Sequence, residues 1–175
     1  MRRVWASLGS TVFFLVAPGT VTGLVPWWLT GWALRPAFFG LEPVRALGVA
    51  LVVLGLIPLI ASFARFAWQG LGTPAPIAAP TQLVVGGFYR HVRNPMYVAL
   101  QAILIGEGLL FANGAVFLWA LMFWLGCHLA VVVYEEPALN RAFGREYETY
   151  RAHVPRWIPR LTPWRAAVSE AKPKL

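Results

Sequence analysis

Cysteine and acidic residues are scarce in this 175-residue sequence. The single cysteine, Cys127, excludes a disulfide within one chain and a metal site built from thiolates, so we expect no metal centre. Asp and Glu together number 7 against 15 Lys and Arg, which gives a formal net charge of +8. The sequence also has no P-loop, no GxGxxG nucleotide-binding pattern and no catalytic-triad signature, so a soluble cofactor-binding fold is not indicated.

Charge of either sign is rare, because only 13% of the residues are charged while 58% are hydrophobic. Soluble domains usually carry about 25% charged residues, so this composition indicates a membrane protein. The basic residues flank apolar stretches, where the positive-inside rule and anionic lipids explain them better than nucleic acid does. We therefore expect membrane lipids as partners and no nucleic acid.

Four apolar segments predict an all-α integral membrane bundle, with spans at about 4–29, 44–68, 95–111 and 115–135. The first uncharged run is longer than the apolar part of a signal peptide, so we interpret it as a retained span. Pro18-Gly19 is expected to kink it. The turn Ala112-Asn113-Gly114 is so short that the third and fourth segments should form an antiparallel hairpin.

The residues after Pro137 change in character. Leu139, Phe143, Tyr147 and Tyr150 recur at helical spacing, which predicts an amphipathic cytoplasmic helix over about 137–153. Residues 1–160 then form a single domain, and 161–175 form a basic, flexible tail. With four spans, most basic clusters fall on one side, so both termini are predicted to be cytoplasmic.

Two charged clusters flank the predicted hairpin. The first is Arg90-His91-Val92-Arg93-Asn94-Pro95-Met96-Tyr97, and the second is Glu135-Glu136-Pro137. The arginines alone are typical of an anchor at a helix start, whereas the acids suit either helix capping or ligand binding. The short hairpin brings both clusters to one membrane depth, where they could form a salt bridge or a site for a zwitterionic ligand.

Two further polar residues lie inside apolar segments. Glu107, in Gly106-Glu107-Gly108, is either functional or solvated near the far membrane interface. His128 is more typical of an interhelical hydrogen bond than of a catalyst.

The run Gly87–Tyr97 followed by Glu135-Glu136 resembles the signature of the isoprenylcysteine carboxyl methyltransferase and phospholipid methyltransferase family. Phe143–Tyr147 and Pro155–Pro159 also resemble the C-terminal region of this family, so the likeness extends over residues 86–159. Asn94, Ala99 and Phe88 depart from residues common in some branches of the family.

The resemblance implies methyl transfer from S-adenosyl-L-methionine to a lipophilic acceptor: an isoprenylcysteine-like carboxylate, a phospholipid amine or a small thiol. It implies that Arg156 contacts the acceptor headgroup. It also implies that the cofactor is bound by His91, Val92, Arg93, Asn94, Tyr97, Glu107, Glu135 and Glu136. The sequence leaves two alternatives open, an NADPH-dependent enzyme of the sterol-reductase type and a non-enzymatic membrane scaffold or transporter.

Overall fold

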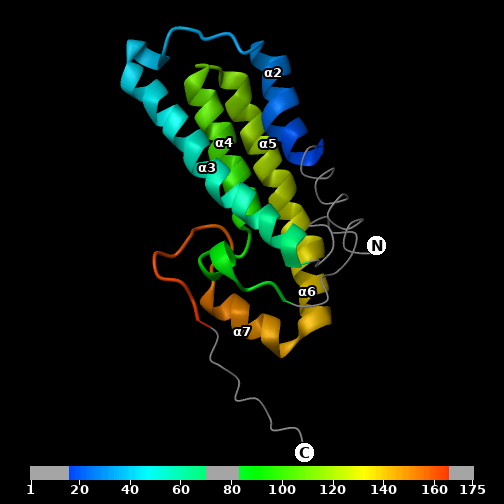
Figure 1. Ribbon diagram of the computed structural model, residues 1–175. Coiled ribbons are helices and arrows are strands. Elements are labelled where there is room, and N and C mark those ends of the chain that lie inside the picture. The colour runs from blue at the N-terminus through cyan, green and yellow to red at the C-terminus, as the bar shows by residue number, and fades with distance from the viewer. Residues whose placement is uncertain (1–15, 70–82, 166–175) are drawn as a thin grey trace, which may run out of the picture.

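This computed structural model describes residues 16–69 and 83–165, and within those ranges every regular element is a helix (Figure 1). Three long helices lie side by side: α3 (Glu42–Gln69), α4 (Pro95–Leu110) and α5 (Gly114–Ala130). The helix α2 (Val25–Thr30) runs beside α5, and α6 (Glu136–Phe143) continues below it. Finally, α7 (Arg145–His153) crosses beneath the lower ends of the long helices. The chain is thus a helical bundle with a short helical layer at one end.

Two helices of the described part are long and apolar enough to cross a membrane. One covers Glu42–Ala64, and the other runs without interruption over Gly114–Phe143. The second has 30 residues, which corresponds to about 45 Å against a bilayer core of about 30 Å. At 16 residues, α4 is a shorter apolar helix of about 24 Å. These apolar helices indicate a membrane protein.

Glycines let α4 approach its neighbours closely. A Cβ on Gly106 would lie 2.6 Å from the Gly48 carbonyl oxygen of α3, and one on Gly108 would lie 2.8 Å from the Phe117 ring of α5. Small residues at such crossings allow close backbone packing in membrane helices, where apolar burial alone gives no preference for protein over lipid. The hairpin of α4 and α5 predicted from the short turn is present, with Asn113 accepting a hydrogen bond from the Ala115 N–H.

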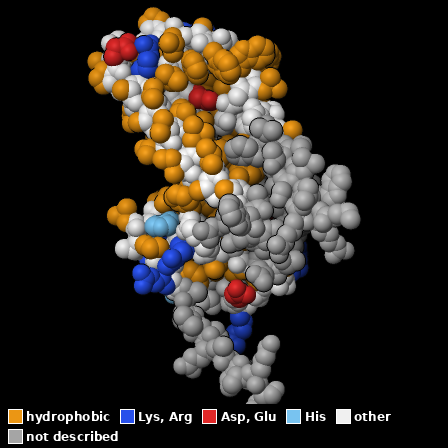
Figure 2. All heavy atoms as spheres, viewed as in Figure 1, with side chains coloured by type: hydrophobic (Ala, Val, Ile, Leu, Met, Phe, Trp, Pro, Cys, Tyr) orange, Lys and Arg blue, Asp and Glu red, His pale blue; other side chains and the backbone are white. Residues whose placement is uncertain are grey.

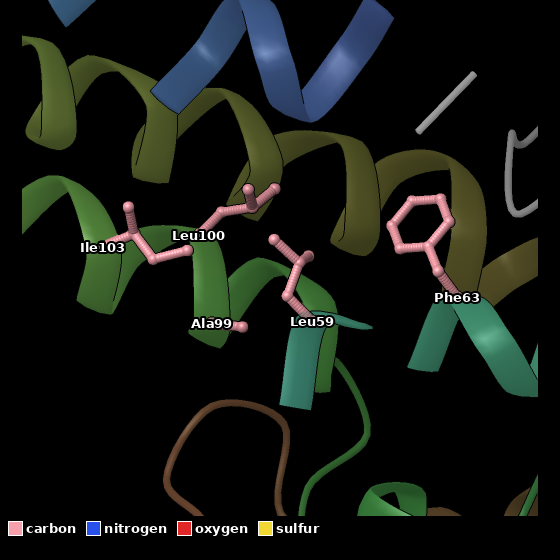
Figure 3. Packing of buried hydrophobic residues seen from close by; sticks show 5 residues of the cluster. All are labelled: Leu59, Phe63, Ala99, Leu100 and Ile103. Atoms are coloured by element: carbon pink, nitrogen blue, oxygen red, sulfur yellow. The ribbon is translucent and has the colours of Figure 1, made fainter. Parts of the chain in front are cut away.

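The buried contact between α3 and α4 lies toward the end of α4 that carries the charged cluster. Leu59 and Phe63 of α3 pack with Ala99, Leu100 and Ile103 of α4, as Figure 3 shows. All five are at most 8% exposed. This packing fixes the start of α4 against α3 and so gives the polar residues around Asn94 a rigid base.

Two of the helical runs carry a π-helical turn just before a proline, whereas α3 contains Pro58 without such a turn. The turn η1 (Thr20–Leu24) precedes Pro26, and the turn η4 (Val131–Glu135) precedes Pro137. A proline cannot donate the usual hydrogen bond, and its ring collides with the carbonyl one turn earlier. The wider π turn accommodates this, because the Glu136 N–H bonds to the Val131 carbonyl instead. The turn η1 begins directly after Pro18-Gly19, where the sequence predicted a kink, and these two residues are themselves helical.

Two boundaries differ from those predicted. The helix from Gly114 does not stop at residue 135 but continues to Phe143. The single helix predicted over 137–153 is two helices, because Gly144 adopts φ 49° and separates α6 from α7. Glycine tolerates this left-handed backbone and commonly follows a helix end. Of the first predicted span, residues 4–15 lie outside the described residues, and residues 16–30 are helical.

Hydrophobic side chains cover most of the upper part of the face in Figure 2, over the long helices. Basic side chains lie at both ends of this face: some are at the upper edge beside an acidic side chain, and others are at the lower end, near the short helical layer. The lower group lies at the end of the bundle that holds the start of α4 and the Glu135-Glu136 pair.

Prediction on helix packing. Replacing Gly106 with alanine should lower the free energy of unfolding by about 1–3 kcal/mol, because the new methyl group overlaps the backbone of α3. The matched control is Gly126→Ala in α5, where an added Cβ meets nothing within 4 Å. We expect the control to keep or slightly raise the midpoint of thermal unfolding in detergent. Equal midpoints for the two variants would contradict this packing.

Candidate functional site

The start of α4 is shaped by the residues that precede it. A short 3-10 helix, η3 (Gly87–Arg90), turns the chain at Gly87, which has φ 60°. Asn94 is the N-cap residue with an extended-type φ of -120°, and Pro95 opens the helix. Proline suits this first position because its missing N–H would have no helical partner there. Residues 90–94 consequently run as an irregular segment across the end of the bundle.

The C-terminal segment, defined here as residues 154–164, pairs with this irregular segment. The Arg93 N–H donates to the Pro155 carbonyl at 2.9 Å, the Arg160 N–H to the His91 carbonyl at 3.0 Å, and the Trp164 N–H to the Arg90 carbonyl at 2.9 Å. Residues 161–164, assigned to a basic tail by the sequence, are therefore partly bound here. The rest of that tail, from residue 166, lies outside the described residues.

Two predicted site residues also bind the C-terminal segment through their side chains. Asn94 Nδ2 donates to the Arg156 carbonyl oxygen at 3.1 Å. His91 Nδ1 lies 2.8 Å from the Arg160 carbonyl oxygen. Because a carbonyl oxygen only accepts, this contact requires the proton on Nδ1. Both side chains thus join the start of α4 to the chain's C-terminal region.

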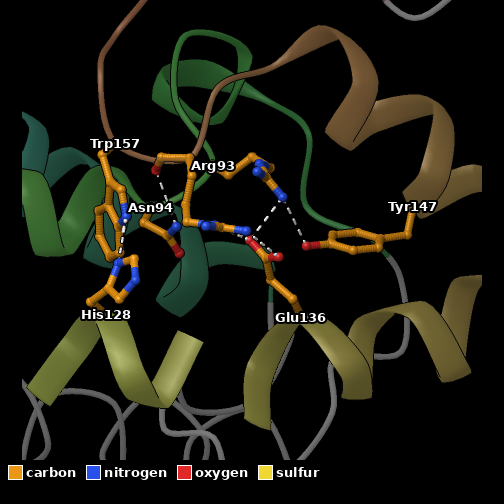
Figure 4. Close-up of polar contacts among 7 residues, drawn as sticks. Arg93, Asn94, His128, Glu136, Tyr147 and Trp157 are labelled. Carbon is orange, nitrogen blue, oxygen red and sulfur yellow. Dashed lines mark hydrogen bonds and ion pairs between the residues drawn. The ribbon is translucent and has the colours of Figure 1, made fainter. Parts of the chain in front are cut away.

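Glu136 is the centre of the charged cluster (Figure 4). Its Oε1 accepts from Arg93 Nη1 at 2.8 Å and from Arg156 Nε at 2.6 Å, while its Oε2 accepts from Arg156 Nη2 at 2.9 Å. The Arg93 and Glu136 side chains are 12% and 13% exposed, against 32% for Arg156. One largely buried carboxylate is therefore paired with two arginines, which leaves one positive charge in excess, and we call these three residues the Glu136 cluster.

Glu135 occupies a different environment from its neighbour. Its Oε1 accepts a hydrogen bond of 2.6 Å from the Tyr97 hydroxyl of α4, and no arginine contact is recorded for it in the described residues. Neither acid forms a side-chain capping bond at the start of α6, so helix capping does not account for the pair. Glu135 therefore has a carboxylate oxygen that the internal contacts of the described chain do not use.

A group of aromatic side chains around His128 was not predicted from the sequence. The Trp157 Nε1–H donates to His128 Nδ1 at 3.2 Å, as Figure 4 shows. Trp124 stacks on His128 at 5.3 Å between ring centroids, and Tyr97 lies 6.5 Å from Trp157. His128 thus forms a hydrogen bond, but its partner lies in the irregular C-terminal segment and not, as the sequence predicted, on a second helix. Its partner could not be identified, since 29 residues separate the two.

Arg93 Nε of the cluster is buried and has no hydrogen-bond partner within the described residues, and the same holds for Gln101 Oε1 of α4 and Asn140 Oδ1 of α6. Gln101 lies one helical turn beyond Tyr97 on α4, and Asn140 lies one turn beyond Glu136 on α6. Buried polar groups are normally paired, so each of these atoms is a candidate for contact with a polar ligand. Gln101 and Asn140 were not predicted as site residues, although their helical spacing could have suggested them.

Two tyrosines of α7 form hydrogen bonds with the cluster and with the segment that precedes it. The Tyr147 hydroxyl accepts from Arg93 Nη1 at 3.3 Å, and the Tyr150 hydroxyl donates to the Tyr89 carbonyl oxygen at 2.7 Å. Burial raises the pKa of both phenols, and for Tyr147 the charge of Glu136 adds to this effect. Both phenols therefore stay neutral around pH 7 and act only through hydrogen bonds and packing.

The structure brings together most of the residues predicted for the site: His91, Arg93, Asn94, Tyr97, Glu135, Glu136 and Arg156. Val92 lies among them but is only 3% exposed. Glu107 is not brought to this place, because it lies ten residues beyond Tyr97, about 15 Å along α4. Its Oε2 is buried without a partner in the described residues. Within those residues no group of three or more potential metal ligands occurs.

Comparison with known proteins agrees with this arrangement. The model of the phospholipid methyltransferase family matches residues 44–146, which is more than half of the chain and includes α3, α4, α5 and both acids. The chain therefore belongs to this family. The prediction from the sequence motif is confirmed, and the enzyme class, a methyltransferase, is confirmed at the level of the family.

One curated relative is the Protein-S-isoprenylcysteine O-methyltransferase of Schizosaccharomyces pombe. The two proteins are 36% identical over 78 residues, which cover 44% of this chain and 33% of the relative. The matching region thus spans about a third of the length of that protein.

Prediction on the Glu136 cluster. Glu136→Gln removes the charge that is paired with two arginines, and it should lower the free energy of unfolding by about 3 kcal/mol. The control is Glu42→Gln, which breaks the Arg45–Glu42 pair, whose acid is 69% exposed. Exposed pairs contribute at most about 1 kcal/mol. Thermal unfolding in detergent measures both, and similar losses would contradict a structural role specific to Glu136.

Proposed function

We propose that this protein transfers a methyl group from S-adenosyl-L-methionine to a lipophilic acceptor at the membrane. The observation that carries the proposal is the Glu135 carboxylate, bonded to Tyr97 at the end of the α4–α5 hairpin, together with the buried, unpaired Nε of Arg93 at the start of the same hairpin. Membership of the phospholipid methyltransferase family supports the same reaction class. The name of the S. pombe relative supports an acceptor of the isoprenylcysteine type, whereas the family name supports a phospholipid.

The donor set fits this cofactor. S-adenosyl-L-methionine carries a carboxylate, an ammonium group, ribose hydroxyls and a sulfonium. Arg93 has an unpaired Nε that suits the carboxylate. Glu135, Gln101 and Asn140 offer acceptor oxygens for the ammonium and hydroxyl groups. His91, Asn94 and Tyr97 hold the surrounding backbone and the Glu135 carboxylate in place.

The bound cofactor supplies a methyl group that is already activated by its sulfonium. The chain's own contribution is then to hold two reactants in line and to exclude water. The aromatic group of Tyr97, Trp124 and Trp157 provides an apolar wall for this purpose. A carboxylate acceptor needs no base, whereas an amine or thiol must lose a proton. His128 does not serve as a base through Nδ1, because that nitrogen already accepts from Trp157.

The membrane arrangement belongs to the proposal as well. We propose four spans, with the Glu136 cluster and both termini at the cytoplasmic side. The cofactor then enters from the cytoplasm, and the apolar acceptor enters from the bilayer. Arg156 is the most exposed of the three charged residues in the Glu136 cluster, which supports its contact with an acceptor headgroup.

Prediction on cofactor binding. Calorimetry in detergent should detect binding of S-adenosylhomocysteine to the folded protein. Glu135→Gln should weaken this binding by about 10–100-fold, because a hydrogen bond to a charged group contributes about 1.5–3 kcal/mol. The amide oxygen still accepts from Tyr97, so the fold should persist. Glu146→Gln on the exposed face of α7 is the control and should bind normally. No binding by the folded wild-type protein would refute the proposal.

Prediction on cofactor class. In a thermal-shift comparison, S-adenosylhomocysteine should raise the unfolding temperature and NADPH should not, because only a ligand of the native state stabilises it. Stabilisation by NADPH alone would favour a reductase. A scaffold or transporter would be indicated if replacing both Glu135 and Glu136 with glutamine left ligand binding and activity unchanged.

The acceptor is identified by a transfer assay. Radiolabelled S-adenosyl-L-methionine is supplied together with a membrane lipid extract or a prenylcysteine analogue. Label in the lipid fraction or in the analogue, with the product identified by its mass, distinguishes N-, O- and S-methylation.

A further inference from the structure

The C-terminal segment presents two large apolar side chains to the outside. Ile158 is 78% exposed and Leu161 is 97% exposed. We call residues 158–161 the tip. This exposure does not come from a loose chain, because the segment is bonded on both sides of the tip: Arg93 N–H binds the Pro155 carbonyl at 2.9 Å before it, and Trp164 N–H binds the Arg90 carbonyl at 2.9 Å after it. A fixed segment with exposed apolar side chains marks an interaction surface.

The neighbours of Trp157 give the depth of this tip. Trp157 directly precedes Ile158 and donates to His128, which lies seven residues before Glu135 on a membrane-length helix. That separation is about 10 Å along the helix axis. Trp124 lies another turn farther and is 6.4 Å from Trp157 between ring centroids. The tip therefore begins beside the apolar part of α5 rather than below the bundle.

The charge around the tip has one sign. Residues 154–165 include Arg156, Arg160 and Arg165 and contain no Asp or Glu. Arg156 is paired with Glu136, whereas within the described residues the Arg160 side chain donates only to the His153 carbonyl and to Thr162. Arg165 is exposed. Basic residues beside exposed apolar ones are typical of segments that bind an anionic lipid surface.

The opposite end of the bundle has the same kind of surface. Between α2 and α3, Trp32 is 60% exposed and Phe39 is 93% exposed. These residues flank the far ends of the long helices, where aromatic and apolar side chains meet the membrane interface. Exposed apolar side chains therefore lie at both ends of the bundle: Trp32 and Phe39 at one end, and Ile158 and Leu161 at the other.

We infer that Ile158 and Leu161 insert into the bilayer at its cytoplasmic edge, with Arg160 and Arg165 contacting anionic lipid headgroups. The occupant of this surface is lipid, because the tip continues the apolar surface of a membrane-length helix and carries a positive charge. Fixing the tip in lipid anchors the C-terminal segment independently of the Glu136 cluster.

The test uses nitroxide labels at single cysteines in a Cys127→Ser background, with the full chain in lipid nanodiscs. Since Cys127 is the only cysteine of the sequence, each variant carries one label. The labelled variants are Ile158→Cys and Leu161→Cys. Leu118→Cys, 59% exposed on α5, is the lipid-facing control, and Ala152→Cys, exposed on α7, is the water-facing control. Collision with oxygen reports lipid, and collision with a water-soluble nickel chelate reports water.

The labels at 158 and 161 should collide mainly with oxygen, as the label at 118 does. Adding anionic phosphatidylglycerol to phosphatidylcholine nanodiscs should raise the ratio of oxygen to nickel collisions at 161, and Arg165→Gln should reduce that rise. Collision mainly with nickel, as at 152, would overturn the inference. So would protection from both reagents, which would mean that protein covers the tip. The readout needs no cofactor or methyl transfer, so its failure leaves the proposed function untouched.

Discussion

The Glu136 carboxylate is the contact on which the polar end of this protein depends. It joins the start of α4 through Arg93, the C-terminal segment through Arg156 and its own helix α6. A carboxylate in this half-buried position needs the two arginines, and each arginine in turn needs the carboxylate. Because these contacts bridge residues 93, 136 and 156, they close the end of the bundle into one unit. The neighbouring Glu135, bonded only to Tyr97 in the described chain, is then presented to that enclosed region.

The two adjacent acids have different partners because they occupy successive positions on the helix. Successive helical residues point in directions about 100° apart, so Glu135 and Glu136 cannot face the same partners. Both carboxylate oxygens of Glu136 are used by internal ion pairs, whereas Glu135 is bonded to Tyr97 and to no arginine within the described residues. The pair that the sequence presents as one motif thus combines a structural residue with a proposed ligand-binding residue.

The sequence predicted those parts that follow from local patterns. The short turn at Asn113 determines the α4–α5 hairpin, and the hairpin brings Arg93, Asn94 and Tyr97 to the depth of the two acids. The sequence did not predict the contacts between distant parts of the chain. These are the hydrogen bond between Trp157 and His128 and the ion pair between Arg156 and Glu136. No periodicity encodes the path of the C-terminal segment. Gly144 could have predicted the break between α6 and α7, because glycine commonly ends a helix. Glu107 was grouped with the site by motif alone, and its position on α4 separates it.

The central claim is that Glu136 holds the C-terminal segment on the start of α4. Amide hydrogen exchange tests it directly, because the N–H groups of Arg93, Arg160 and Trp164 are all bonded across this contact. In a comparison of wild type with Glu136→Gln, the account predicts faster exchange at these three amides and unchanged exchange in the middle of α4. Equal protection of the three amides in both proteins would contradict it.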